Sequence, residues 1–252
     1  MRIGTCDVRL LAALSISAAV LIACEPERPV APQPSGTAIS VRFEFVRNGS
    51  PFGSAELHPD GADHAMRYST LRFIASGFTL FSASGEVLAD FHSKAAIPDA
   101  FEDAVNWPLG RITHGEPTAL RMHLGLDSAL NHANPVTLPF PLSSPEIHWS
   151  WNPAAGFKFL EMEGRVDADA DGAVDGAADQ LFLCHCATDA LMRTDSVEVQ
   201  PTMEGGTMVL VVPVDVGALL TGIDLLLASE AMGADPPCAQ AMDNLVGAVG
   251  AP

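Results

Sequence analysis

Short stretches of alternating apolar and polar residues dominate the middle of the chain. From Ile39 to Phe45 every second residue is apolar, which is the pattern of a strand with one buried face. The Asn48-Gly49 pair that follows favours a tight hairpin turn. Patterns of the same kind predict strands over 71–81, 120–124, 156–162, 180–186, 196–199 and 207–212.

Helical periodicity is scarce by comparison. Only residues 100–105, 216–226 and 238–246 have an apolar spacing that fits a helix. Many short strands separated by turn residues are typical of two packed sheets. We therefore expect an all-β fold, a β-sandwich with a few short helices and an Asp-rich loop, in one domain over residues 38–252.

The most distinctive stretch runs from Ile147 to Asn152, because it holds two of the three tryptophans of the chain. In an extended strand Ile147, Trp149 and Trp151 share one side, while His148 and Ser150 share the other. Such a strand presents a bulky aromatic surface. Packing in the core of the sandwich also accounts for the two indoles, so the pattern alone assigns no function.

The N-terminal residues have the features of a bacterial secretion signal. Two arginines precede an apolar run that is too short for a stable membrane span. The run ends in the lipobox-like sequence Leu-Ile-Ala-Cys24, so residues 1–23 are expected to be removed and Cys24 to be lipidated. Glu25 after the cysteine favours sorting to the outer membrane, and the Pro-rich residues 24–37 form a tether. We expect a lipid-anchored protein of the bacterial periplasm.

The charge of the chain is strongly negative. Its 31 Asp and Glu residues outnumber its 13 Lys and Arg residues, which gives a net charge of −18 at pH 7. Such a surface repels nucleic acid and anionic lipid headgroups. We therefore expect no nucleic-acid partner, contact with the membrane only through the lipid anchor, and an affinity for cations or for a basic partner surface.

An Asp-rich loop predicts a calcium site. Carboxylates stand at its first, third, fifth and ninth positions, and glycine stands at the sixth, as in loops that bind calcium through oxygen ligands. Ala178 occupies the twelfth position, where an EF-hand carries glutamate, and an aspartate follows it. The predicted structural calcium ligands are Asp167, Asp169, Asp171, Asp175 and Asp179. The alternative is a solvated acidic hairpin.

Four sequence blocks together resemble the MbnP family of periplasmic copper-binding proteins, which includes four-Cys proteins of the metallo-mystery pair. The resemblance extends from about Val41 to Val249, and the Trp-Ser-Trp block is its most specific part. The blocks are Leu130–Pro135, Pro139–Ser144, His148–Trp151 and Gly156–Phe159. The resemblance implies copper as a cofactor and a diheme cytochrome c peroxidase-like partner of the MbnH type, which oxidises a tryptophan to a copper-binding kynurenine.

The resemblance also selects candidate copper ligands. His132 falls in the Leu-Asn-His block, and His185 stands near the position of a strand histidine in the family. His148 adjoins the tryptophans, and His64 and His92 remain possible ligands because imidazole suits copper. The full set of predicted copper residues is His132, His185, Trp149, Trp151, His148 and His64.

The cysteines fit an oxidising compartment. Cys184 and Cys186 share one face of a predicted strand, where a direct bridge between them is strained. Cys238 lies in a segment that resembles the last cysteine block of the family, which implies that it pairs with one of the two. The remaining cysteine is either a free thiol or a soft copper ligand beside His185.

These observations predict a copper-binding protein that is not itself an enzyme and that acts in copper acquisition or handling. The sequence contains no Ser-His-Asp order, phosphate loop or nucleotide fingerprint. The main alternative is a calcium-stabilised structural or adhesion lipoprotein in which the two tryptophans only pack. A thiol redox protein built on Cys184 and Cys186 is a weaker third possibility, because thioredoxin-like motifs have two residues between their cysteines.

Overall fold

Three β-sheets build the part of the chain that the structure describes. The computed structural model describes residues 35–176 and 178–251, so the expected signal peptide and Cys24 lie outside the described residues. Sheet A has the order β12 (Pro201–Glu204), β13 (Thr207–Asp215), β1 (Thr37–Arg47) and β2 (Ser50–Pro51), and β7 (Trp107–Ile112) also pairs with β1. Sheet B has the order β14 (Glu230–Gly233), β10 (Gln180–Ala187), β9 (Lys158–Val166), β4 (Ala65–Phe73) and β3 (His58–Pro59). Sheet C has the order β11 (Arg193–Glu198), β8 (Ala119–Leu124), β5 (Ala75–Phe81) and β6 (Val87–Ala96).

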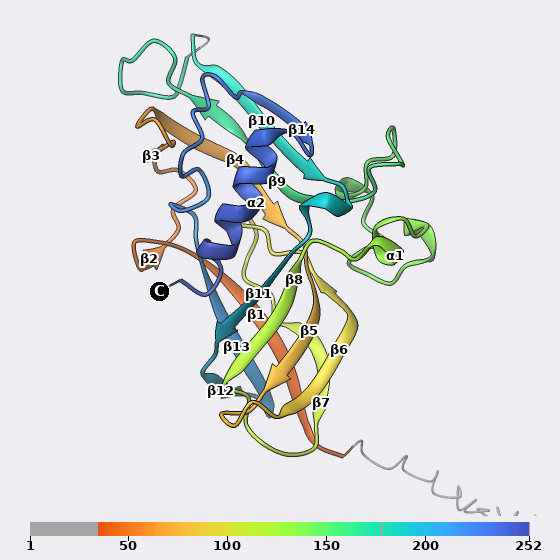
Figure 1. The fold of residues 1–252 in the computed structure, drawn as a ribbon. Helices are drawn as coiled ribbons and strands as arrows, with labels where there is room; N and C mark the ends of the chain where they lie inside the picture. Colours follow the sequence, from red (N-terminus) through yellow and green to blue (C-terminus); the bar gives the residue numbers. More distant parts are fainter. Residues whose placement is uncertain (1–34, 177, 252) are drawn as a thin grey trace, which may run out of the picture. The chain divides into compact units, whose positions relative to one another are not determined.

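The all-β expectation is confirmed by this arrangement (Figure 1). Strand β1 forms as predicted, with Ile39, Val41 and Phe43 buried. The turn after β1 has positive φ at Asn48 and Gly49, as the hairpin signal predicts. Phe43 contacts Phe73 of β4 edge to face, with 5.5 Å between ring centroids. This aromatic contact joins the cores of sheets A and B.

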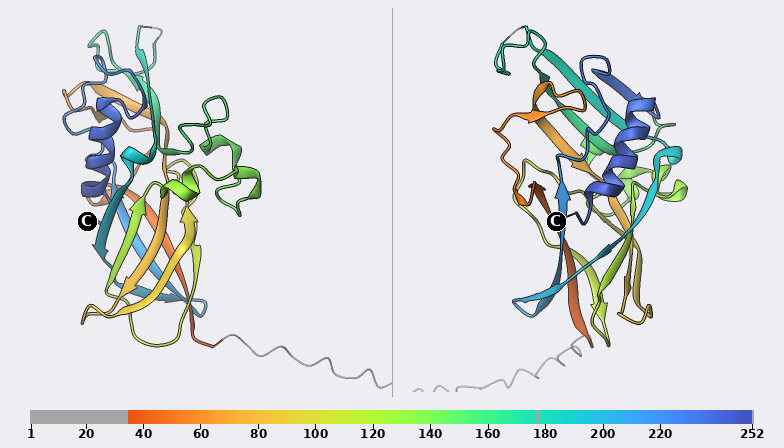
Figure 2. Two further views of the ribbon diagram at one scale, coloured as in Figure 1. Left: turned by 45° about the vertical axis from the view of Figure 1, so that its right-hand side comes forward. Right: turned by 60° about the vertical axis from the view of Figure 1, so that its left-hand side comes forward.

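Helix α2 (Pro236–Ala248) covers one side of sheet B near β11, as Figure 2 shows in dark blue. Its buried residues recur at three- and four-residue intervals, which places them on one stripe of the helix. They are Cys238, Ala241, Met242, Leu245 and Ala248. A disulfide between Cys238 and Cys186 of β10 ties this helix to the sheet. Within the described residues, neither α2 nor the four-residue α1 (Ser128–Asn131) is long and apolar enough to cross a membrane.

Two predicted helices do not form. Residues 100–105 follow Asp99, whose side chain accepts a hydrogen bond from the Phe101 amide at 2.9 Å, and this local turn replaces a helix that is too short to nucleate. Residues 216–226 form successive turns with hydrogen bonds from Thr221 to Ala218 and from Ile223 to Leu220. Glycine at 217 and 222 lowers the helical propensity of that segment.

The predicted strand from Ile147 to Asn152 is also wrong. Its first residue ends the 3₁₀ turn η2 (Pro145–Ile147), and the rest forms a tight loop closed by a hydrogen bond from the Trp149 amide to the Gly156 carbonyl at 2.9 Å. Prolines at 145 and 153 disfavour a continuous strand. The two tryptophans therefore differ, because Trp149 is 5% exposed and Trp151 is 72% exposed.

Several short or mostly exposed elements escape the sequence patterns. Strand β6 is an edge strand in which only Leu88 and Ala96 are buried, so its alternation is weak. The segment between β8 and β9, green at the right of Figure 1, contains α1, the 3₁₀ turn η1 (Pro135–Thr137) and η2. A further 3₁₀ turn, η3 (Asp189–Leu191), follows β10.

Candidate metal centre

A row of polar side chains crosses sheet B on the face opposite its apolar core. The strand register places Arg72 of β4 beside Glu161 of β9, Glu161 beside His185 of β10, and His185 beside Met232 of β14. The residues that alternate with them, such as Met162 and Cys184, are fully buried. The period of two along each strand therefore separates this row from the core.

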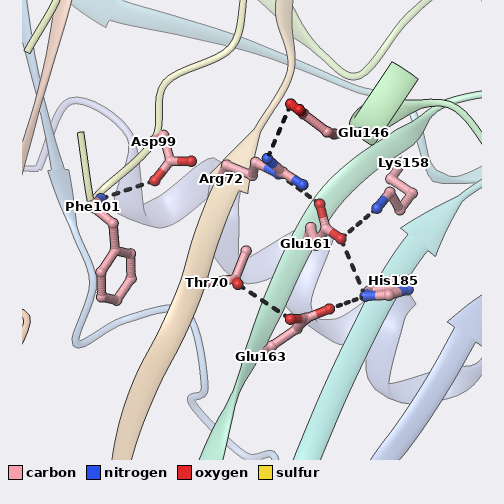
Figure 3. Close-up of polar contacts among 9 residues, drawn as sticks. All are labelled: Thr70, Arg72, Asp99, Phe101, Glu146, Lys158, Glu161, Glu163 and His185. Atoms are coloured by element: carbon pink, nitrogen blue, oxygen red, sulfur yellow. Dashed lines mark hydrogen bonds and ion pairs between the residues drawn. The ribbon is translucent and has the colours of Figure 1, made fainter. Parts of the chain in front are cut away.

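One nitrogen of the His185 imidazole faces two carboxylates, those of Glu161 and Glu163, as Figure 3 shows. Its Nε2 atom lies 2.7 Å from Glu163 Oε1 and 3.3 Å from Glu161 Oε1. The ligand atoms of these three residues lie within 4.8 Å of one another. We call Glu161, Glu163 and His185 the sheet cluster. Its imidazole and carboxylate donors form the nitrogen and oxygen set that Cu(II) accepts.

Two cations balance the charge of Glu161, which is 4% exposed. Arg72 Nε donates to Glu161 Oε2 at 2.6 Å, and Lys158 Nζ donates to Glu161 Oε1. Burial acts to raise the pKa of Glu161, but the bonds from Lys158 and Arg72 outweigh it and lower the pKa below its ordinary value. Glu161 is thus an ionised carboxylate engaged by two cations, which leaves His185 and Glu163 as the available ligands of the cluster.

Trp149 packs beside this cluster. Its ring centroid lies 6.5 Å from that of His185, and its side chain contacts Ala155, Ala187 and Met232. Trp151 lies against Trp149 edge to face at 5.0 Å between ring centroids. The exposed indole of Trp151 therefore contacts a buried indole that lies next to the metal-ligand side chains.

His148 and His132 have other partners. His148 pairs with Phe157 in an isolated bridge and packs edge to face on its ring at 5.0 Å, and burial lowers the pKa of His148. His132 Nε2 lies 3.2 Å from a carboxylate oxygen of Asp189, an exposed residue of η3. Neither histidine belongs to a cluster of three metal-ligand side chains in residues 35–176 and 178–251.

His64 belongs to a second cluster on the loop between β3 and β4. Its Nδ1 atom lies 3.1 Å from Asp60 Oδ2 and 3.6 Å from Asp224 Oδ1. Hydrogen bonding to Asp60 raises the pKa of His64. Asp60 also accepts three backbone N–H bonds, including one from Leu225 at 2.9 Å. The cluster therefore has a structural task, which is to hold the 216–226 segment against β3. His92, the other possible ligand, is exposed on β6.

The Asp-rich loop brings three of its five predicted ligands together. Ligand atoms of Asp167, Asp169 and Asp179 lie within 4.8 Å of one another, whereas Asp171 and Asp175 are exposed and outside this group. Asp167 accepts backbone hydrogen bonds from residues 170 and 172 at 2.7 and 2.8 Å. These bonds shape the loop, and we call the three residues the loop cluster.

The two strand cysteines have different roles. Cys186 forms a disulfide with Cys238. This confirms the prediction that Cys238 pairs with one of the two strand cysteines. Cys184 is free and fully buried, and burial raises the pKa of its thiol to about 11. Adjacent residues of a strand point to opposite faces, so Cys184 lies on the core side and His185 on the other. The idea of Cys184 as a soft ligand beside His185 is therefore wrong.

Sequence reasoning missed the carboxylates that surround His185. Glu161 and Glu163 alternate with buried residues of an otherwise apolar strand, and this was an available signal. Asp224 gave no such signal, because 160 residues separate it from His64 and only the fold brings them together. Asp60, four residues before His64, was a local neighbour that sequence reasoning passed over.

Comparison with known proteins agrees with this architecture. A sequence model of the MbnP family matches residues 36–239. Among solved structures, MbnP from Methylosinus trichosporium is similar, with a TM-score of 0.53 and 20% identity over 81% of this chain and 86% of that chain. At this identity the likeness concerns the fold. No match to a curated protein was found.

Proposed function

The chain belongs to the MbnP family, and we propose from this premise that it binds copper at the sheet cluster and serves in copper acquisition or handling rather than as an enzyme. The observation that carries the proposal is the position of His185, with Glu163 at 2.7 Å on one side and the Trp149 ring on the other. Imidazole and carboxylate both bind Cu(II). His185 and Glu163 would hold the ion, and His132 is a further ligand in the proposal.

Trp149 is the tryptophan that we propose to be oxidised to kynurenine. An intact indole N–H is only a donor, whereas the aryl amine of kynurenine has a nitrogen that can bind a metal. Trp149 packs beside the His185 ring, whereas Trp151 is exposed and packs on Trp149. The conversion is a four-electron oxidation that cleaves the indole C2–C3 bond and adds two oxygen atoms to give N-formylkynurenine, and hydrolysis then releases the formyl carbon as formate. We assign the oxidation to a diheme cytochrome c peroxidase-like partner of the MbnH type, which would pass the electrons to peroxide. The exposed Trp151 offers that partner an indole in contact with Trp149.

Co-expression with a diheme cytochrome c peroxidase-like protein of the MbnH type tests the assignment. We expect the tryptic peptide with Trp149 to gain one oxygen and lose one carbon, and copper affinity to rise with the modified fraction. Trp151→Phe should keep Trp149 as the modified residue, whereas Trp149→Phe should abolish the mass change. His185→Ala should weaken copper binding at least about tenfold, because a ligand of the ion is removed.

Unmodified Trp149 in the co-expressed protein would overturn the kynurenine step. Copper binding by His185→Ala that equals that of the wild type would overturn the site itself. Trp149 belongs to a loop held by hydrogen bonds to Asn131 and Gly156, so a substitution there can disturb the local fold. Folding of each variant is therefore checked by circular dichroism before titration.

A lipid anchor at Cys24 and a periplasmic location complete the proposal. The lipobox-like sequence and the Pro-rich tether support it. Cys24→Ser should move the mature protein from the membrane fraction to the soluble periplasmic fraction. Continued partition of that variant with membranes would contradict the anchor.

We also propose that the loop cluster binds calcium. Three aspartates whose oxygens lie within 4.8 Å of one another repel each other, and a hard divalent cation with oxygen ligands relieves that repulsion. The calcium is structural in this proposal. If the protein keeps calcium but binds no copper, a calcium-stabilised structural or adhesion lipoprotein becomes the better description.

A further inference from the structure

Two arginines face each other across strands β4 and β9 without a carboxylate partner. The register places Arg67 directly opposite Arg165, and like charges in that position destabilise a sheet. Neither arginine forms an ion pair with any carboxylate in the described part of the chain. This is unexpected in a chain with 31 Asp and Glu residues against 13 Lys and Arg residues.

The guanidinium of Arg67 has a buried atom with no partner. Its Nε is shielded from solvent and makes no hydrogen bond within the described residues. Arg165 is bound only through Nη1, which donates to the Asp179 carbonyl at 3.2 Å. The nearest carboxylate on the same face of β9 is Glu163, which is bound to His185 and Thr70 instead. Both guanidinium groups therefore keep N–H donors without a partner among the described residues.

A small pocket lies between these two arginines. Its volume is about 160 Å³, and Arg67, Ser69, Arg165, Val174 and Leu181 contribute to its walls. Ser69 is the residue that the β4–β9 register skips, and it offers a hydroxyl at the rim. This volume is below the usual range of about 300–1,000 Å³ for organic ligands, so a small ion suits it better than a nucleotide.

We propose that this pocket binds a small oxyanion of the phosphate type. The planar fork of arginine matches phosphate and carboxylate oxygens through paired N–H bonds. An anion between Arg67 and Arg165 would convert the repulsion of the two cations into two attractive contacts. It would also provide an acceptor for the buried Nε of Arg67. The proposal is independent of copper, because neither arginine belongs to the sheet cluster.

Titration calorimetry of the full mature protein in calcium-free buffer tests the pocket. Sodium phosphate, sodium sulfate and sodium acetate are compared at equal ionic strength, so that tetrahedral and carboxylate oxyanions are distinguished. We expect one phosphate per protein. Arg67→Gln and Arg165→Gln should each weaken binding at least about tenfold, the factor that corresponds to ~1.4 kcal/mol.

Arg121→Gln is the matched control. Arg121 lies on β8 of sheet C over the Phe81 ring, at 5.1 Å from its centroid, and makes no ion pair within the described residues. The same loss of one charge there should leave phosphate binding unchanged. Arg67→Lys keeps the charge but removes the fork, so it should bind phosphate more weakly than the wild type.

The melting temperature gives a second measurement. Without anions, Arg67→Gln should melt at or above the wild-type temperature, because the substitution removes a like-charge contact. Phosphate should raise the melting temperature of the wild type and of Arg121→Gln but not of Arg67→Gln. Binding that survives equally in all variants, or no binding of any of the three anions by the wild type, would overturn the proposal. Acetate binding with the same dependence on both arginines would extend the site to carboxylates.

Discussion

The sheet cluster and the loop cluster each bring three metal-ligand side chains together, but they balance their charge differently. Glu161 of the sheet cluster receives hydrogen bonds from Arg72 and Lys158. The loop cluster has backbone amides as its donors, such as the Gly172 amide at 2.8 Å from Asp167. Side-chain cations fully neutralise a carboxylate, whereas amide dipoles do so only in part.

The pKa shifts show the consequence of this difference. The pKa of Glu161 is lowered despite its burial, because Lys158 and Arg72 stabilise the charged form. The pKa of Asp169 is raised, first by desolvation and then by the neighbouring Asp171 and Asp167. Protein cations therefore stabilise the charged form of Glu161, whereas Asp169 has carboxylates as its charged neighbours. Asp167 of the loop cluster has a lowered pKa instead, because backbone amides, first that of Gly172, donate to it.

Removal of the Glu161 charge should have the largest effect on the free energy of unfolding, because it takes away the carboxylate that the two cations of the sheet cluster engage. Glu161→Gln leaves Arg72 and Lys158, whose side chains are 20% and 10% exposed, without their carboxylate. Breaking such a buried pair costs about 3–5 kcal/mol, which urea denaturation followed by circular dichroism can measure. Glu163→Gln, a matched change two residues away, should cost much less, because Glu163 has no Arg or Lys partner in the described part of the chain and its side chain is 37% exposed. Equal costs for the two variants would show that the cations do not need Glu161.

Calcium removal should have the next largest effect, and it should act only through the loop cluster. At a calcium concentration of a hundred times Kd, binding stabilises the folded state by ~2.7 kcal/mol, which corresponds to roughly 5–10 °C in Tm for a domain of this size. Scanning calorimetry with excess calcium and with EGTA measures the difference. Asp169→Asn should reduce this difference in melting temperature, and Glu163→Gln should leave it unchanged. Identical melting with and without calcium would contradict a bound ion.

The pH dependence of stability should give the smallest effect, with opposite signs for Glu161 of the sheet cluster and Asp169 of the loop cluster. The contribution of ionised Glu161 is fully present above the ordinary glutamate pKa of 4.5 and is lost as pH falls through the lowered folded-state value. The raised pKa of Asp169 means that the folded state binds its proton more tightly. Its unfavourable contribution is therefore relieved as pH falls toward the ordinary value of 3.8.

Calcium-free urea denaturation across the acidic range measures these slopes. Relative to the wild type, Glu161→Gln should lose less stability on acidification, and Asp169→Asn should lose more. Parallel curves for all three proteins would mean that neither carboxylate has a different pKa in the folded and unfolded states.

Alternation along the chain was sufficient to predict most of the long strands. Strand β1 and strand β8 each bury one face, so their period of two is visible in the sequence. The pattern failed where tertiary contacts replace local preference. The Trp149 loop is held by Gly156 and by the buried Asn131, whose Oδ1 accepts from the Phe157 amide at 2.8 Å. These contacts come from segments that no local window includes.

The candidate sites divide in the same way. The Asp-rich loop is visible because its ligands follow one another within 13 residues, and a calcium loop is a local structure. The sheet cluster was only half visible, since His185 was selected without Glu161 and Glu163. Their proximity depends on the pairing of β9 with β10, where His185 lies opposite Glu161.

The sequence by itself determined the β-rich class, the distinctive tryptophan block and the calcium-like loop, which depend on neighbouring residues or on composition. The pairing of Cys238 with a strand cysteine, 52 residues away, was implied by the resemblance to the family. Only the tertiary structure decided that Trp149 is buried beside His185 while Trp151 is exposed, that Cys184 points into the core, and that Arg67 faces Arg165. The physical reason is register, because a shift of one residue between paired strands moves every side chain to the other face of the sheet.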